Sequence, residues 1–299
     1  MSLMTVIFAD FVGHCNTMGV YVVSLLKRTA LSIGLSAIGL TIGLAGSAQA
    51  YPALPGLVNL NFLSYTGGAP KDIFTYVKPV GWTGGSGLIS VDAPGTATQN
   101  VQAHGNSYPT WGDPGPVPGG GNFVQADGNP NYESGFNYTL TGLTVGQIYS
   151  LSFYQAASQQ TGFTGATTNQ WIVSLTDIAS GGLKTRNKPG SPGFKEYYST
   201  DATASIQATS LMSVPSHGTV GWQYVSVNLV ADATSELLSF LAWGDNGSTV
   251  NLPPTAFLTG VDAPPGLVPE PATLSLLGVG LLGIGGAVLR RRAKRNLAD

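Results

Sequence analysis

The chain has 299 residues, of which 43% are hydrophobic and only 9% are charged, with a net charge of −2 and a single Cys. A typical soluble domain carries about 25% charged residues, so this composition is unusual. The hydrophobic fraction and the small net charge exclude a disordered, highly charged tail protein. One Cys excludes zinc ribbons and disulfide scaffolds, and the absence of a basic excess argues against a partner made of nucleic acid.

The N-terminal region contains the three parts of a secretory signal peptide. Lys27 and Arg28 precede an apolar run over residues 29–46, and the run is followed by the small-x-small pair Ala48 and Ala50. A basic segment, an apolar core and an Ala-x-Ala site are the features that signal peptidase reads. We therefore expect a signal peptide region over residues 1–50, export through Sec-type machinery, and cleavage after Ala50.

The length of this region also bears on the start of translation. Counted from Met1 the signal peptide has 50 residues, whereas the usual length is about 15–30. A start at Met18 shortens it to 33 residues, and we expect translation to begin there. The only Cys, Cys15, lies upstream of the apolar core, so the mature chain is expected to contain no Cys.

The C-terminal region has the pattern of a membrane anchor. Residues 272–289 carry no charge and would form a helix of about 27 Å, which suffices for a hydrocarbon core of about 30 Å when flanking arginines snorkel. Five of the 13 basic residues follow in residues 290–295. By the positive-inside rule, a basic tail over residues 290–299 is cytoplasmic and the rest of the mature chain lies outside.

Together with the Pro-rich linker over residues 263–271, these features resemble the PEP-CTERM sorting signal of exopolysaccharide-producing Gram-negative bacteria. The resemblance implies processing by an exosortase, a membrane-embedded cysteine protease, after a transient stage in the inner membrane. It also implies a final location at the cell surface or in the extracellular matrix. An ordinary single-pass anchor is the alternative. The residues that carry the resemblance are Val268, Pro269, Glu270 and Pro271 and, after the Gly-rich apolar span, Arg290, Arg291 and Arg292.

The body between the two ends has the pattern of a β protein. Residues 237–243 are apolar on both faces, which indicates a central strand, and no apolar stripe with the helical period of 3.6 stands out between residues 51 and 268. We predict an all-β fold, a single jelly-roll-like β-sandwich over residues 51–262, flanked by the signal peptide and a transmembrane helix. Period-two alternation, typical of half-buried strands, occurs at residues 136–141, 149–154, 171–176 and 224–229.

Several of these segments resemble the galactose-binding-like jelly-roll domains of exported PEP-CTERM proteins. The similar segments are residues 122–128 with the strand pair that follows, and the pair formed by residues 221–230 and 238–243. The resemblance implies a binding module and assigns no ligand. Residues 51–267 hold six basic and twelve acidic residues, a charge that offers no attraction to nucleic acid or anionic lipid.

Three aromatic residues are candidates for binding exopolysaccharide or another glycan. Tyr108 and Trp111 lie in the long Gly/Pro-rich loop of residues 104–122, and Trp82 lies beside Gly84. Exposed aromatic rings on rigid loops stack against sugar rings, while neighbouring polar groups bond the hydroxyls. The alternative, which we favour, is that these rings fold back and cap the open end of the sandwich, because large aromatic side chains are mostly buried.

The segment from Asp127 to Glu133 places oxygen-bearing side chains at alternate positions, namely Asp127, Asn129, Asn131 and Glu133. Calcium takes six to eight such oxygen ligands, so no cofactor is expected except calcium at this loop. An EF-hand is excluded, because Tyr132 occupies the position of its required Gly. Asp, Gly, Asn and Pro also form turns, which is the favoured interpretation here, and residues 245–247 read as a hairpin turn.

The residues available for catalysis are few. The body contains two His, His104 and His217, which read as ordinary loop residues, and no Cys, nucleophile elbow, zinc-protease helix or phosphate loop. A glycosidase needs two facing carboxylates. The candidates are Asp113, Asp127, Glu133 and Asp245. We predict a binding protein and not an enzyme, and a structural or adhesive coat protein without a small-ligand site is the alternative.

Overall fold

Strands make up nearly all of the regular structure in the computed structural model, which describes residues 51–100, 104 and 108–260. Several predicted features lie outside the described residues. They are the expected signal peptide with Ala48 and Ala50, the C-terminal linker, the expected membrane helix and the basic tail. Among the residues that are described, no helix is long and apolar enough to cross a membrane.

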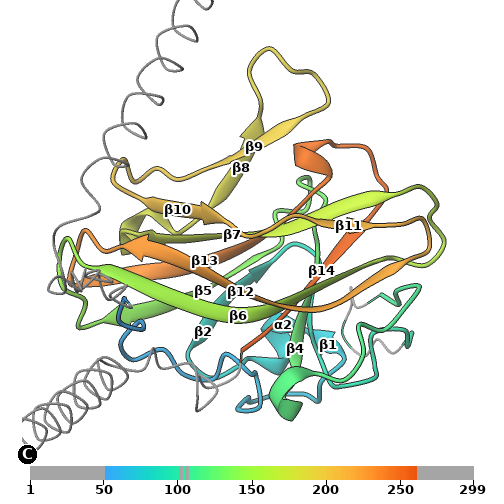
Figure 1. Ribbon diagram of the computed structural model, residues 1–299, viewed down its shortest axis with the longest axis horizontal. Helices are drawn as coiled ribbons and strands as arrows, with labels where there is room; N and C mark the ends of the chain where they lie inside the picture. The colour runs from blue at the N-terminus through green and yellow to red at the C-terminus, as the bar shows by residue number, and fades with distance from the viewer. Residues whose placement is uncertain (1–50, 101–103, 105–107, 261–299) are drawn as a thin grey trace, which may run out of the picture. The chain divides into compact units, whose positions relative to one another are not determined.

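Two antiparallel sheets form a sandwich (Figure 1). The first sheet has the order β1 (Asp72–Ile73), β3 (Ile89–Asp92), β4 (Phe123–Asp127), β14 (Pro254–Thr259), β6 (Ile148–Gln159) and β12 (Thr219–Val230). The second has the order β10 (Ser205–Ala208), β7 (Thr167–Thr176), β13 (Ser235–Gly244), β5 (Gly135–Thr141) and β2 (Trp82–Ser86), with β11 (Met212–Val214) also paired to β7. The prediction of an all-β two-sheet sandwich is confirmed.

Smaller elements connect and cover these sheets. A separate hairpin is formed by β8 (Lys184–Asn187) and β9 (Lys195–Tyr198), and α2 (Phe74–Val77) is a single helical turn. Short 3-10 turns occur at Pro118–Gly120, Ile178–Ser180 and Asp245–Gly247.

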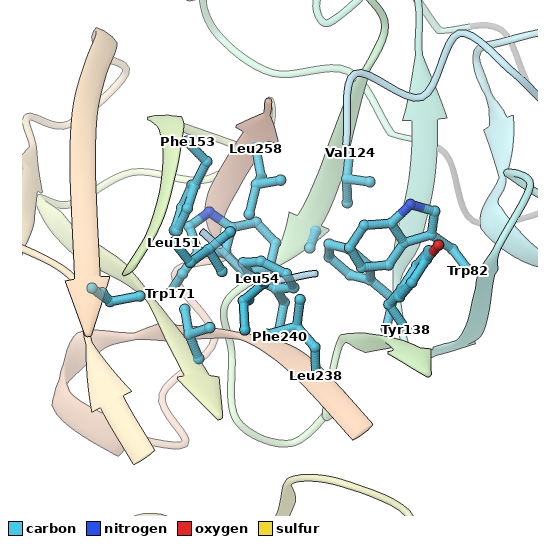
Figure 2. Close-up of a cluster of buried hydrophobic side chains, with 14 of the residues drawn as sticks. Leu54, Trp82, Val124, Tyr138, Leu151, Phe153, Trp171, Leu238, Phe240 and Leu258 are labelled. Atoms are coloured by element: carbon cyan, nitrogen blue, oxygen red, sulfur yellow. The ribbon is translucent and has the colours of Figure 1, made fainter. Parts of the chain in front are cut away.

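Alternation along the strands builds the core between the sheets. In β5, Phe136, Tyr138 and Leu140 are buried while Thr139 and Thr141 are exposed, as predicted. Leu151 and Phe153 of β6 are buried against the second sheet, and Figure 2 shows them in one cluster with Trp171 and Phe240. Strand period two therefore directs every other side chain into a single apolar layer.

Strand β13 is central, as its two apolar faces predicted, because it pairs with β5 on one side and β7 on the other. Its outward side chains Leu241 and Trp243 are buried beneath Leu183, Tyr197 and Ile206.

Strand β7 is more buried than its alternation predicted. Residues 171–176 were expected to be half-buried, with one face toward solvent. Ile172, Ser174 and Thr176 on the outer face are nevertheless buried, because residues 178–206 cross back over the second sheet.

The prediction of a hairpin turn at residues 245–247 is wrong. Asp245 and Asn246 do turn, with positive φ angles of 46° and 52°. However, the turn leads from β13 in the second sheet to β14 in the first, so it crosses between the sheets and does not join paired strands.

The aromatic cluster predicts where the fold is most sensitive. Phe240 is 1% exposed and its ring stacks on Phe136 at 5.1 Å. Phe240→Ala is expected to lower the free energy of unfolding by about 3–5 kcal/mol, because it leaves a cavity that the packed rings cannot fill. Val145→Ala, at a side chain that is 60% exposed, is the control and should change it by less than about 0.5 kcal/mol. Equal urea midpoints for the two variants would contradict this packing.

Candidate functional site

Two of the three predicted aromatic ligand residues are buried. Trp82 is 5% exposed, its Nε1 donates to the backbone oxygen of Asn59 at 3.0 Å, and its ring lies 5.0 Å from that of Tyr138 (Figure 2). Tyr108 is 6% exposed, and its backbone oxygen accepts a hydrogen bond from Gln125 Nε2 at 2.7 Å. These rings offer no open face to a sugar. Both follow the alternative interpretation, in which the aromatic side chains fold back onto the sandwich.

Trp111 is the exception, with 41% of its surface exposed. Its backbone N–H donates to Gln159 O at 2.9 Å, its Nε1 donates to Phe163 O at 3.1 Å, and its ring lies 4.3 Å from that of His217. These contacts fix the indole at one end of β6, where that strand pairs with the start of β12.

A second aromatic feature follows the same two strands on their solvent-facing side. Tyr154 of β6 and Tyr224 of β12 are directly paired, and their rings lie 5.1 Å apart at an angle of 59°. Tyr224 is 42% exposed. Phe153, next to Tyr154, is buried in the core, and Val225, next to Tyr224, packs against it, so alternation places both tyrosines on the outer face.

Small polar side chains extend this face along β6 and β12. Ser226 Oγ lies 2.9 Å from Ser150 Oγ and accepts a hydrogen bond from Ser152 Oγ at 3.1 Å, and Asn228 is exposed beside them. We call this surface the β6–β12 strip, and it comprises Ser150, Ser152, Tyr154, Tyr224, Ser226 and Asn228. Two phenol rings with neighbouring hydroxyl and amide groups provide apolar faces and hydrogen bonds in one place, which is what a sugar chain requires.

Sequence reasoning recognised these strands and missed their outer face as a site. The signal was present in the alternation itself. Once Leu151 and Phe153 are assigned to the core, Tyr154 and Ser152 must point to solvent, and the same applies to Tyr224 beside Val225.

The segment proposed for calcium forms a chain of side-chain-to-backbone turns. Asp127 Oδ1 accepts from Asn129 N at 2.7 Å, and Asn129 Oδ1 accepts from Asn131 N at 3.0 Å. The Asn131 amide donates to Thr249 O at 3.4 Å, while Glu133 Oε2 accepts from Thr185 N at 3.1 Å. These contacts correspond to the turn interpretation. Within the described residues there is no group of three or more His, Cys, Asp or Glu side chains arranged to hold a metal.

Two of the four candidate carboxylates lie near the contact between the sheets. Gly244 N donates to Gly128 O at 2.7 Å, which brings together the residues next to Asp245 and Asp127. A Cβ atom at Gly128 would lie 2.7 Å from Asn169 Oδ1 and 3.1 Å from Gly244 N, so a larger residue here would force the Asn169 side chain to move. Asp113 and Glu133 form hydrogen bonds in other parts of the body. Asp113 Oδ1 accepts from Gly115 N at 2.9 Å, and Glu133 Oε2 accepts from Thr185 Oγ1 at 2.9 Å.

Burial controls the charge of these two carboxyl groups. It raises the pKa of Asp127 to about 7, with a further contribution from the neighbouring Asp245 carboxylate. Burial also raises the pKa of Asp245, although Thr168 N donates to its Oδ1 at 2.9 Å. The Oδ2 atoms of both residues are buried without a hydrogen-bond partner, which favours the protonated form.

Comparison with known proteins identifies the C-terminal segment. Residues 267–292 match the PEP-CTERM protein-sorting motif. The protein is thus an all-β sandwich that carries a PEP-CTERM motif at its C-terminus, and this motif implies exosortase processing and direction to the cell surface. The match includes Val268, Glu270 and Arg290–Arg292, as the sequence predicted. No curated protein matches the chain.

Among solved structures, the body distantly resembles the CBM22-1–GH10 modules of the Clostridium thermocellum N-terminal endo-1,4-β-D-xylanase 10B, complexed with xylohexaose. The identity is 15% and the TM-score is 0.27, with 61% of this chain and 26% of that chain covered. The chain therefore spans about a quarter of the length of that protein. No functional inference rests on this likeness.

The raised pKa of Asp127 predicts how stability depends on pH. The pKa of Asp127 is about 7 in the folded state and 3.8 in the unfolded state, so the folded state binds this proton more tightly. The free energy of unfolding therefore falls as the pH rises from 3.8 to 7. Asp127→Asn keeps the acceptor for Asn129 N and removes the charge. Between pH 4 and pH 8, the variant should gain up to about 4 kcal/mol in unfolding free energy relative to wild type, at about 1.36 kcal/mol per unit.

Urea denaturation at a series of pH values measures this difference. Glu236, whose pKa is raised to about 8 by burial and by the neighbouring Asp232, acts in the same direction in both proteins and cancels in the comparison. Glu196→Gln, which removes a carboxylate paired with Arg186 on the surface, is the control for loss of a charge outside this site. Parallel curves for Asp127→Asn and wild type would refute the assignment.

Proposed function

We propose that this is an exported surface or matrix protein of a Gram-negative bacterium whose body binds exopolysaccharide or another glycan through the β6–β12 strip. The signal peptide ending at Ala50 delivers it to Sec-type export, the helix over residues 272–289 holds it transiently in the inner membrane, and exosortase processes it near Pro269–Pro271. The observation that carries the proposal is the Tyr154–Tyr224 pair on one outer face, in which Tyr224 is exposed and Tyr154 half-buried, together with its serine neighbours.

Several features support binding and not catalysis as the role of the body. Asp127 is buried and Asp245 is partly buried, and both have raised pKa values, whereas the strip offers rings and hydroxyl groups to solvent. Trp111, at the end of the same strand pair, is a further exposed ring beside Tyr224.

The strip makes a direct prediction for glycan binding. The protein with Tyr154→Ala and Tyr224→Ala should bind the producing organism's exopolysaccharide at least about fivefold more weakly, because each ring contributes on the order of 1 kcal/mol of stacking. Co-sedimentation of the exported protein with that polysaccharide measures the effect. Tyr65→Ala, at a tyrosine of similar exposure (36%) outside the strip, is the control and should bind as wild type does.

Two outcomes would overturn the proposal. If wild type itself fails to sediment with the polysaccharide, the protein is better described as a structural or adhesive coat component. If it sediments but the double variant does so equally well, the strip is not the binding surface. Repeating the assay with a calcium chelator tests the loop from Asp127 to Glu133, where we expect no change because its side chains already serve turns.

Processing at both ends gives a separate prediction. The intact mass of the protein recovered from the cell surface should lack residues 1–50 and the residues that follow the Pro269–Pro271 region. In a variant with Pro269→Ala and Glu270→Ala, the recognition segment is lost and residues 290–295 should remain attached. A wild-type surface form that retains residues 290–295 would refute exosortase processing.

A further inference from the structure

Positive charge is concentrated in one small part of the body. Residues 51–267 are acidic overall, yet four of their six Lys and Arg residues lie within residues 184–195. They belong to the hairpin β8–β9 and its tip, which Figure 1 shows standing out from the sheet that contains β7 and β13. We call residues 184–198 the basic hairpin.

The two faces of the basic hairpin have different roles. The Tyr197 ring packs against the Trp243 ring with centroids 5.2 Å apart, and the Thr185 hydroxyl donates a hydrogen bond to Glu133. One face of the hairpin is therefore attached to the sandwich. Alternation directs Lys184 and Arg186 to the opposite face. There, Arg186 lies 4.7 Å above the Tyr198 ring and its Nε donates to Glu196 at 2.7 Å, as the strand register requires.

A cavity of about 460 Å³ that opens to solvent lies at the tip of the hairpin. Its lining includes Asn131, Asn187, Lys188, Ser191, Phe194 and Thr249. Two backbone hydrogen bonds hold the tip in place. Lys188 N donates to Phe194 O at 3.0 Å within the tip, and Thr249 N donates to Gly193 O at 2.9 Å from a neighbouring segment. The cavity is therefore formed before any ligand arrives, which reduces the entropic cost of binding.

The cations of this region are available to a ligand. Within the described part of the chain, Arg186 pairs with Glu196, whereas Lys184, Lys188 and Lys195 have no carboxylate within ion-pair distance. In contrast, Lys71 is buried and paired with Asp92 at 2.8 Å. Phe194, at the cavity, is 40% exposed.

The geometry points to a second glycan site, in which the basic hairpin and its tip cavity bind a sugar that carries a carboxylate. Lys188 pairs with the carboxylate, Phe194 packs against the ring, and the amide of Asn187 forms hydrogen bonds with the hydroxyls. This inference rests on the proposed function, because it names the chemical class of glycan. A concave cavity lined by amides suits a shaped ligand such as an acidic sugar better than the surface of an anionic membrane.

The test uses two forms of one polymer. The exported protein, produced from the full-length sequence, is incubated with polygalacturonate and with the same polymer after methyl esterification of its carboxylates. We expect it to bind the acidic form at least about threefold more tightly, with a difference that diminishes as salt is added. Lys188→Gln should abolish this preference and Lys188→Arg should keep it. Lys78→Gln removes an exposed lysine outside the hairpin and should behave as wild type.

Three results would overturn the inference: equal binding of the two polymers, an unchanged preference in Lys188→Gln, or binding to vesicles containing phosphatidylglycerol in place of the polymer. Thermal unfolding of each variant confirms that it is folded. The proposed function is tested independently. If polygalacturonate is not bound but the organism's exopolysaccharide still sediments in a manner that depends on Tyr154 and Tyr224, only the second site fails.

Discussion

The stacked rings of Phe136 and Phe240 are the contact on which the rest of the structure depends. They are directly paired across β5 and β13, with centroids 5.1 Å apart and planes within 10° of parallel. Phe153 of the first sheet meets Phe240 edge-on at 5.4 Å, so the same cluster joins the two sheets. A shift of one residue in any of these strands would exchange its inner and outer faces. The core therefore fixes the strip as well, since burying Phe153 is what turns Tyr154 outward.

Much of the fold follows from the sequence, because period-two alternation is a local property. It located β5, β6 and β12, and the two apolar faces of residues 237–243 identified a central strand. Alternation could not show that residues 178–206 cover the second sheet, which is why Ile172 and Ser174 are buried where a solvent face was expected. That contact joins distant segments, and no local pattern records it.

The candidate site was less predictable for the same reason. The loop positions of Trp82 and Tyr108 made both rings candidates for a ligand, but the favoured interpretation was that they fold back onto the sandwich. Both rings are buried, because burial of a large aromatic side chain outweighs the preference of its loop for solvent. Trp111 stays exposed because two hydrogen bonds hold it at the end of β6. Its backbone N–H donates to Gln159, and its Nε1 donates to Phe163 just beyond that strand. The carboxylates show the converse. Asp127 and Asp245 are far apart in sequence and become neighbours only where Gly128 and Gly244 meet.

The two proposed surfaces belong to different sheets, and this placement limits what the protein can do with a polysaccharide. The β6–β12 strip is the outer face of the first sheet, whereas the basic hairpin packs through Tyr197 onto Trp243, on the outer face of the second. A single short oligosaccharide cannot occupy both surfaces, because the whole core lies between them. Two polysaccharide chains, or two parts of one long chain, can occupy both surfaces at the same time. When two parts of one chain bind, binding of the first part raises the effective concentration of the second part at the other surface. Binding at both faces would link polysaccharide strands through a rigid sandwich. In that case a glycan-binding module and a structural component of the matrix are the same function, and the exosortase motif delivers it to the place where such links are made.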